Sequence, residues 1–502
     1  MRVWCLILLG LCTTALAQTL QFTEEFESSK SLVALQILNS RESSFDVLRY
    51  NKAAHDITVE RRDKRSGGIL WFRPLKLDSV NAGWFNYEDL DYLFFADNQF
   101  VYFVFEKAIN TKKSVFIKRI DDNGVSSGFK ELGFLDKDEQ VQSFDFKIKY
   151  KKSELLLVGE QYYVGASSKK VVLLFDLQAW KPRWVKKLPL ENNLTGFSSN
   201  YEWNPRGDLY YVMGSARENG VRRQYVNNTQ QYKPIFAYDS LFVARLSHPE
   251  NTLSAHKINN RDSMRVKSVS LVCDTSEVWF NCYYSDDKED RYAKLFFKSQ
   301  CYNRDLSQRT KDKETGLNPS IVQQLTFFDG GDYNGANEKE FSMLSSLKND
   351  SCLISMAERK EPNYAKEILF WRTSTGDAAV RTQLLLPRKV FYFANRVRFK
   401  QVENTWSQLK GNTCYFFVLE NRANASITPD KFSYHSFVMQ PYLDGGTLTC
   451  YQVRENGKTE KQVLFKNGDY DYVPLAYQTL QPDVVFYFNK GKKEKFAILM
   501  LK

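Results

Sequence analysis

The chain has 502 residues, of which 43% are hydrophobic, 26% charged and 15% aromatic, and its formal net charge is +11. This composition excludes collagen, coiled-coil and multi-span membrane proteins, and it supplies enough apolar side chains for a large core. The basic surplus is typical of a surface that meets acidic glycans, cell surfaces or anionic lipids, although a charge spread evenly over the chain would simply keep it soluble.

Residues 1–17 predict a secretory signal peptide. Arg2 supplies the positive charge, an apolar run extends from Val3 to Leu11, and Ala15-Leu16-Ala17 gives the small-x-small cleavage pattern. No later stretch offers the roughly 18 uninterrupted apolar residues that a membrane helix needs. We therefore expect a secreted, extracellular protein without a transmembrane anchor. Export also argues against nucleic acid as a partner.

A basic run, RRDKR, ends at Arg65 and is followed by Ser66-Gly67-Gly68. Its Arg-x-Lys-Arg pattern is one that furin-like proteases recognise, and cleavage after Arg65 would release residues 18–65. The alternative is a solvated hairpin loop, which is the more common role of a charge run.

Most of the chain alternates between short apolar groups and turn-forming residues, which is typical of strands joined by turns. In residues 144–150 the alternation is strict, and it places Phe144, Phe146, Ile148 and Tyr150 on one face. A pair of such strands recurs seven times. The first strand of each pair begins near Val101, Leu155, Leu209, Val278, Cys352, Cys414 and Val484, and the second near Val115, Val172, Leu241, Leu295, Ile368, Phe437 and Ala497.

Seven units of about four strands each predict an all-β chain that forms a single seven-bladed β-propeller over residues 18–502. A four-stranded sheet cannot bury both faces alone, whereas radial packing against neighbouring blades buries them, and large aromatic side chains fill the space between blades. Six or eight blades, and two stacked β-sandwiches, are the alternatives.

The two ends of the chain are predicted to close the ring. The last unit stops at its third strand, 496–501, so the missing strand would come from the N-terminus, from Leu32–Leu38 or Phe45–Tyr50. Such pairing removes an exposed sheet edge. The Arg65 site would then lie between the closing strand and the rest of the ring.

The stretch 302–340 is polar and contains glycines, and we expect it to form a long exposed loop. Near its end, Asp329, Asp332 and Asn334 could wrap a calcium ion. The simpler interpretation is a turn whose side chains bond to their own backbone.

Four of the repeated strands end in glutamate, at Glu106, Glu160, Glu358 and Glu420. The inner strands of a propeller line a central channel, where a ring of carboxylates would bind Ca²⁺ and support hydrolysis of a lactone or an ester. The alternative is that these glutamates face solvent. No cofactor other than Ca²⁺ is expected.

Cysteines and sequons agree with export. An even number of cysteines in an oxidising compartment predicts disulfides, here among Cys273, Cys282, Cys301, Cys352, Cys414 and Cys450. Asn-x-Ser/Thr sequons predict N-linked glycans on exposed loops, at Asn193, Asn227, Asn349 and Asn424.

Catalytic motifs are missing from the sequence: it contains no GxSxG, HExxH, P-loop or GxGxxG. We therefore predict a secreted, glycosylated, disulfide-containing propeller that binds an extracellular protein or glycan through its surface loops, without catalysis. The partner would be acidic if the basic surface is used. The alternative function is a calcium-dependent hydrolase that uses the channel carboxylates. A precursor processed at Arg65 is a third class.

Overall fold

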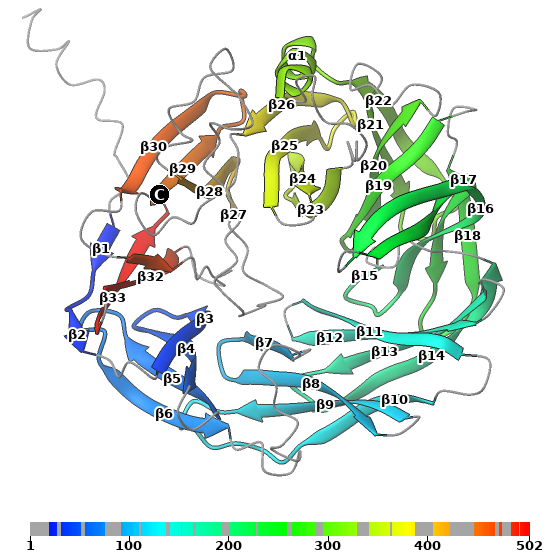
Figure 1. The fold of residues 1–502 in the computed structure, drawn as a ribbon. Coiled ribbons are helices and arrows are strands. Elements are labelled where there is room, and N and C mark those ends of the chain that lie inside the picture. Colours follow the sequence, from blue (N-terminus) through cyan, green and yellow to red (C-terminus); the bar gives the residue numbers. More distant parts are fainter. Residues whose placement is uncertain are drawn as a thin grey trace, which may run out of the picture.

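The computed structural model describes residues 20–27, 32–51, 56–75, 92–109, 112–136, 141–151, 153–163, 167–192, 201–226, 229–258, 264–286, 295–328, 341–361, 364–386, 405–421, 446–466, 471–473, 483–490 and 492–501. They form eight antiparallel sheets arranged as blades in a closed ring (Figure 1). The chain is therefore an all-β, single β-propeller, as predicted, but it has eight blades and not seven.

The first four blades take their strands in chain order. Blade 1 contains β3 (Leu32–Ser40), β4 (Ser44–Asn51), β5 (Asp56–Asp63) and β6 (Ile69–Leu75). Blade 2 contains β7 (Tyr92–Ala96), β8 (Val101–Ile109), β9 (Lys112–Ile120) and β10 (Lys130–Asp136). Blade 3 contains β11 (Val141–Lys151), β12 (Glu154–Tyr163), β13 (Ser167–Asp176) and β14 (Lys181–Asn192). Blade 4 contains β15 (Tyr201–Trp203), β16 (Leu209–Val226), β17 (Thr229–Leu246) and β18 (Leu253–Ile258).

The next three blades repeat this order. Blade 5 contains β19 (Met264–Cys273), β20 (Glu277–Asp286), β21 (Phe296–Asn303) and β22 (Arg309–Gly316). Blade 6 contains β23 (Phe341–Lys348), β24 (Cys352–Glu361), β25 (Tyr364–Ser374) and β26 (Val380–Leu386). Blade 7 contains β27 (Thr405–Lys410), β28 (Thr413–Asn421), β29 (Gly446–Val453) and β30 (Thr459–Lys466). The strand predicted near Phe437 lies outside the described residues.

Blade 8 joins the two ends of the chain. It contains β31 (Asp471–Val473), β32 (Asp483–Lys490) and β33 (Lys493–Met500), and its outer strands are β1 (Leu20–Phe22) and β2 (Phe26–Glu27), which both pair with β33. Leu20 lies opposite Leu499, and Phe26 lies opposite Glu494. Closure of the last blade by an N-terminal strand is thus confirmed, but the closing residues precede both of the segments that the sequence suggested.

Blade 1 is the blade that the sequence does not predict, and the reason is physical. The seven predicted repeats correspond to blades 2–8, whereas the second strand of blade 1, β4, carries Asp46 and Arg49, which interrupt its apolar run. Both charged side chains are nevertheless fully buried. A strand with buried charges resembles an exposed one in sequence, which is why the sequence predicts Leu32–Leu38 or Phe45–Tyr50 as a closing strand and not as part of a separate blade.

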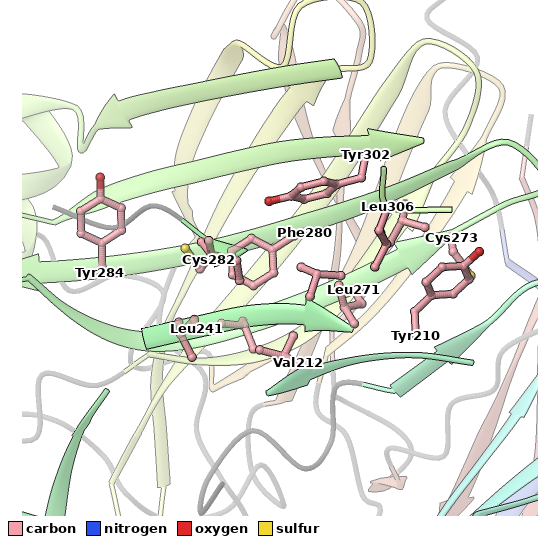
Figure 2. Packing of buried hydrophobic residues seen from close by; sticks show 14 residues of the cluster. Tyr210, Val212, Leu241, Leu271, Cys273, Phe280, Cys282, Tyr284, Tyr302 and Leu306 are labelled. Atoms are coloured by element: carbon pink, nitrogen blue, oxygen red, sulfur yellow. The ribbon is translucent and has the colours of Figure 1, made fainter. Parts of the chain in front are cut away.

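The core lies between the blades. Among the described residues, each of the eight interfaces between neighbouring blades contains a cluster of buried apolar side chains. Figure 2 shows the cluster between blades 4 and 5, where Tyr210 and Leu241 face Leu271 and Phe280. The predicted face of β11 takes part in another such layer, since Phe146 and Ile148 belong to the cluster between blades 2 and 3.

The stretch predicted as a long loop, 302–340, is partly regular. Its first part contains β22, the outermost strand of blade 5, and helix α1 (Pro319–Phe328). Asn318 caps this helix by accepting a 3.0 Å hydrogen bond from the Ser320 amide, and Pro319 fits the first helical turn. Ile321 is buried against blade 6, which holds the helix in place. Within the described residues no helix has the length and apolarity that a membrane span requires.

Candidate functional site

The glutamates predicted to line the channel lie one strand away from it. Glu106, Glu160, Glu358 and Glu420 belong to β8, β12, β24 and β28, the second strands of their blades. The strands nearest the ring centre are the first ones, such as β7 and β27 (Figure 1). The second strand has sheet neighbours on both sides and is therefore the most apolar in sequence, and the sequence alone does not distinguish it from the innermost strand. The four glutamate side chains lie outside the described part of the structure.

The structure does not test calcium binding. Asp329, Asp332 and Asn334 lie outside the described residues. Within the ranges that are described, no three His, Cys, Asp or Glu side chains gather as a metal site would require. The calcium-dependent hydrolase stays an untested alternative.

The six cysteines are core residues and not disulfide partners. All six are buried, and the structure shows no disulfide between them: Cys273, Cys282, Cys301, Cys352, Cys414 and Cys450. Burial raises the pKa of Cys301 to about 11 and that of Cys450 to about 12. The disulfide prediction is thus not supported, because each thiol sits on a strand and acts as a small apolar side chain in an inter-blade layer.

Of the four sequons, the structure describes only Asn349. Its amide nitrogen donates hydrogen bonds of 2.6 Å to the Gly411 carbonyl and 3.2 Å to Asn412 Oδ1, which link blade 6 to blade 7. A glycan on that nitrogen would compete with this link. Asn193, Asn227 and Asn424 lie outside the described residues.

Arg65 lies in the tight turn between β5 and β6, within blade 1 and not between the closing strand and the ring. The Arg65 side chain is exposed, but Arg62 is only 4% exposed and Lys64 forms an ion pair with Asp483 of blade 8. A protease that recognises the whole Arg-x-Lys-Arg pattern would therefore have to displace two of its three basic side chains from the folded ring. Cleavage there stays untested.

We call the junction of blades 8 and 1 the seam. Two arginines of blade 1, one of them in the basic run, form a buried charge network there. Arg49 Nε donates a 2.8 Å hydrogen bond to Glu60 Oε2, and Arg49 Nη2 donates a 2.7 Å bond to Glu494 Oε2 on β33. Arg62 binds the same Glu60 oxygen through Nε and Nη2, at 2.9 and 2.7 Å. Two arginines and two glutamates thus tie the first blade to the last.

The pKa values at the seam follow from this geometry. Burial alone would lower the pKa of Arg49, but the neighbouring Glu60 and Glu494 outweigh it, and the pKa is raised. The pKa of Arg62 is lowered by burial and by the charge of Arg49. Phe26 of β2 covers this pair, since its ring centroid lies 4.3 Å from the Arg62 guanidinium carbon.

A cavity of about 450 Å³ opens above the network. Arg49, Glu60 and Arg62 line it from blade 1, Phe26 lines it from the closing segment, and Ile69 lines it from the start of β6. Arg49 Nη1 is buried and has no hydrogen-bond partner among the described residues. A buried donor without a partner costs free energy in the folded protein.

Three exposed carboxylates, of Glu24, Glu25 and Glu27, also line the cavity. One of them, Glu25, pairs with Lys493 at 2.7 Å. The charges of the two buried arginines and the two buried glutamates cancel one another. The exposed carboxylates on the rim therefore make the cavity acidic, and an acidic cavity favours positively charged ligand groups.

Next to the cavity, β6 presents an apolar free edge. Ile69, Leu70 and Phe72 are 50%, 57% and 62% exposed. β6 is the last strand of its sheet, and within the described residues no strand pairs with its outer side. The seam therefore combines an acidic cavity, an unpaired buried donor and an exposed apolar strand.

Sequence reasoning missed this site. The signal was present as two short segments, the acidic FTEEFE at 22–27 and the apolar ILWF at 69–72. Forty-one residues separate them, and only ring closure places both beside the same cavity.

No protein-family model matches the sequence. No curated protein matches it either. The WD40 domain of SCAP from fission yeast shares 6% identity at a TM-score of 0.39, over 95% of this chain and 98% of that one. The β-propeller domain of the Trilobed protease from Pyrococcus furiosus shares 9% at 0.35, over 87% and 98%. The Nup133 β-propeller domain from Vanderwaltozyma polyspora shares 9% at 0.31, over 81% and 99%.

These similarities concern the propeller fold alone. The fold is compatible with a binding role, but propellers also include enzymes, so the function has to be argued from the site.

Proposed function

We propose that this chain is a secreted propeller that binds an extracellular protein at the seam of blades 8 and 1 and does not catalyse a reaction. The supporting observation is the exposed apolar edge of β6 beside the seam cavity. Export is supported by the signal-like sequence of residues 1–17.

A protein ligand fits this edge better than a glycan does. A free strand edge offers backbone donors and acceptors to an extended polypeptide, and exposed Leu70 and Phe72 offer apolar contacts to its side chains. An uncovered apolar edge also invites aggregation, so a partner that covers it removes a liability. The acidic partner expected from the net charge does not suit this site, because the cavity rim is itself acidic.

The test is a double substitution, Leu70→Ser with Phe72→Ser, in the full chain. Fragments of extracellular proteins, displayed as a library, are selected on the wild-type chain and then titrated against the variant. We expect binding to weaken by about tenfold or more, because the apolar contact of these two side chains is lost. The matched control is Val185→Ser on β14 of blade 3, where Val185 is 57% exposed.

Equal binding by the double variant would contradict the proposal, and so would a selection that yields no fragment. Light scattering checks one further occupant of the edge. If the wild-type chain is a dimer and the double variant is a monomer, then β6 is covered by a second copy of the chain and not by a different protein.

A further inference from the structure

We infer that the polypeptide bound along β6 carries an acidic side chain, which binds Arg73 of β6 and Lys118 of β9 in the neighbouring blade 2. This inference rests on the proposed function, since it assumes that an extended segment pairs with the edge of β6. It adds the chemical class of a side chain that the bound segment must present. We call Arg73 and Lys118 the cation pair.

The cation pair lies at the layer between blades 1 and 2. Arg73 follows Trp71 by two positions on β6, and Trp71 packs in this layer. Lys118 precedes Ile120 by two positions on β9, and Ile120 is buried in the same layer. Burial and then the charge of Arg73 lower the pKa of Lys118, as expected for two nearby cations.

In the described part of the chain, neither cation forms an ion pair with a carboxylate. Arg73 is exposed, and its Nε donates a hydrogen bond to the Gly124 carbonyl. Lys118 is half-buried, and its Nζ lies 4.7 Å from the centroid of the Phe129 ring. Two nearby like charges without a counter-charge repel each other, so an anion that reaches both stabilises them.

The two carboxylates of the adjacent turn, which belongs to blade 2, are already engaged. Asp122 pairs with Arg61 at 2.8 Å and with Arg41 at 3.4 Å. Asp121 accepts bonds of 2.9 and 2.8 Å from two amides of its own turn. The counter-charge that the cation pair lacks can therefore come from a bound partner.

A strand that pairs with β6 presents its side chains alternately to the two faces of blade 1. On the seam side it meets Phe72, which lies opposite Glu60 of β5 and is 62% exposed. On the other side it meets Arg73, the next residue of β6. Apolar side chains suit the first face, and an acidic side chain suits the second, because cross-strand pairs of opposite charge attract.

The acidic rim of the seam cavity lies at the other end of the strand. Ile69, the first residue of β6, lines that cavity, and Arg73 follows it by four positions. At roughly 3.3 Å per residue, about 13 Å separates the two positions. The bound segment therefore carries its carboxylate at the Arg73 end and is not acidic throughout.

The experiment uses three mixtures of N-acetylated heptapeptides with a C-terminal fluorophore. All three carry Val, Leu or Phe at positions 2, 4 and 6 and Ser at both ends. Positions 3 and 5 are Glu in the first mixture, Gln in the second and Lys in the third. Fluorescence anisotropy with the full chain should show that the Glu mixture binds about fivefold more tightly than the Gln mixture, with the Lys mixture weakest.

Substitution of the cation pair supplies the second measurement. Arg73→Gln with Lys118→Gln should reduce the preference for Glu over Gln to about twofold or less. Arg73→Gln alone, at an exposed position, should reduce it in the same direction if the double variant folds poorly. The matched control is Lys181→Gln with Lys187→Gln, two exposed lysines on β14, the outermost strand of blade 3. It removes the same net charge and should keep the full preference.

The outcomes separate this inference from the proposed function. If the wild type binds the Glu and Gln mixtures equally and the Leu70→Ser, Phe72→Ser variant loses both, acidic recognition is wrong while binding at β6 stands. If the control on β14 loses the preference as well, the preference arises from the net charge of the chain, and the inference is wrong.

If the variant of Leu70 and Phe72 binds every mixture as the wild type does, the β6 proposal is wrong and the inference falls with it. Failure of all three mixtures to bind overturns the inference, whereas the β6 edge is still tested by the fragments selected on the wild-type chain.

Discussion

Among single residues, the basic side chains of the run 61–65 form ion pairs within blade 1 and with both neighbouring blades. Arg61 contacts Asp46 within blade 1 at 2.8 Å and Asp122 of blade 2 at the same distance. Arg62 is held by Glu60, and Lys64 pairs with Asp483 of blade 8. Three basic side chains of the run thus contact the two neighbouring blades and blade 1 itself, which explains why most of the run is not a solvated loop.

A carboxylate at the interface of blades 5 and 6 gives a prediction at the same scale. Asp274 accepts a 2.6 Å bond from Lys348 Nζ and bonds of 2.8 and 2.9 Å from the amides of Ser276 and Glu277. Burial alone would raise the pKa of Asp274, but these bonds to its charged form prevail and lower it from 3.8 to about 2.

Because the pKa of Asp274 is lower in the folded chain than in the unfolded chain, the ionised carboxylate contributes to the free energy of unfolding, and this contribution depends on pH. It is fully present above the unfolded value near 3.8 and is lost as the pH falls through about 2. Because Asp274 is partly exposed, we expect only about 1 kcal/mol from it. Asp274→Asn should therefore be less stable than wild type at pH 6, and the gap should close between pH 4 and 2 in denaturant titrations.

Lys348→Met should lose part of the same effect, because the two backbone bonds to Asp274 remain. If the wild-type and Asp274→Asn stability curves stay parallel from pH 6 to 2, the carboxylate has no such role.

At the scale of elements, the closure depends on a contact between a turn and the closing segment. Thr23, between β1 and β2, donates its amide to the Phe496 carbonyl at 2.9 Å and accepts from the Phe496 amide through Oγ1 at 3.0 Å. Gly67, in the β5–β6 turn, has a φ of 73° and packs against the same threonine. A Cβ at Gly67 would lie 2.9 Å from Thr23 Oγ1, so only glycine fits.

We therefore predict that Gly67→Ala lowers the free energy of unfolding by about 1–2 kcal/mol, from left-handed backbone strain and crowding of Thr23. Chemical denaturation measures the loss. Gly128→Ala is the matched control, because nothing lies within 4 Å of a Cβ there and its φ is not in the left-handed region. Equal midpoints for the two variants would show that the turn does not press on the closing segment.

In the whole molecule, the eight inter-blade layers form a closed ring, because every blade packs against two neighbours. The layer at the seam differs from a purely apolar one, because Arg49, Glu60 and Glu494 are buried beside the cluster of Ile37, Val47 and Phe496. Buried ion pairs contribute little net stability but penalise wrong pairings, so we interpret them as setting the register at which the last blade meets the first.

Removal of the closing segment tests this circuit. A chain that lacks residues 18–27 loses β1 and β2 and exposes the edge of β33. We expect its unfolding free energy to fall by about 3 kcal/mol or more relative to a chain that begins at Gln18, with a tendency to aggregate through the open edge. Differential scanning calorimetry and light scattering measure both effects, and a synthetic peptide of residues 18–27 should restore part of the midpoint. An unchanged midpoint after the deletion would mean that the ring does not need this closure.

The sequence by itself determined the architecture. Strict alternation and a strand pair repeated through blades 2–8 required sheets that bury both faces, and a truncated last unit required an N-terminal partner. These features are local patterns. They can be read from the sequence because a strand that packs on one face places apolar residues at every second position.

The tertiary structure alone decided the eighth blade, the state of the cysteines and the candidate site. Arg49 and Asp46 make β4 resemble an exposed strand, and their burial depends on partners from β5, from β33 and from Arg41 in the β3–β4 turn. The cysteines were assigned from an expected compartment, whereas their packing depends on which blade faces which. The seam brings together residues from 24–27, 49, 60–69 and 494, and such a juxtaposition has no local signature, because it exists only once the ring has closed.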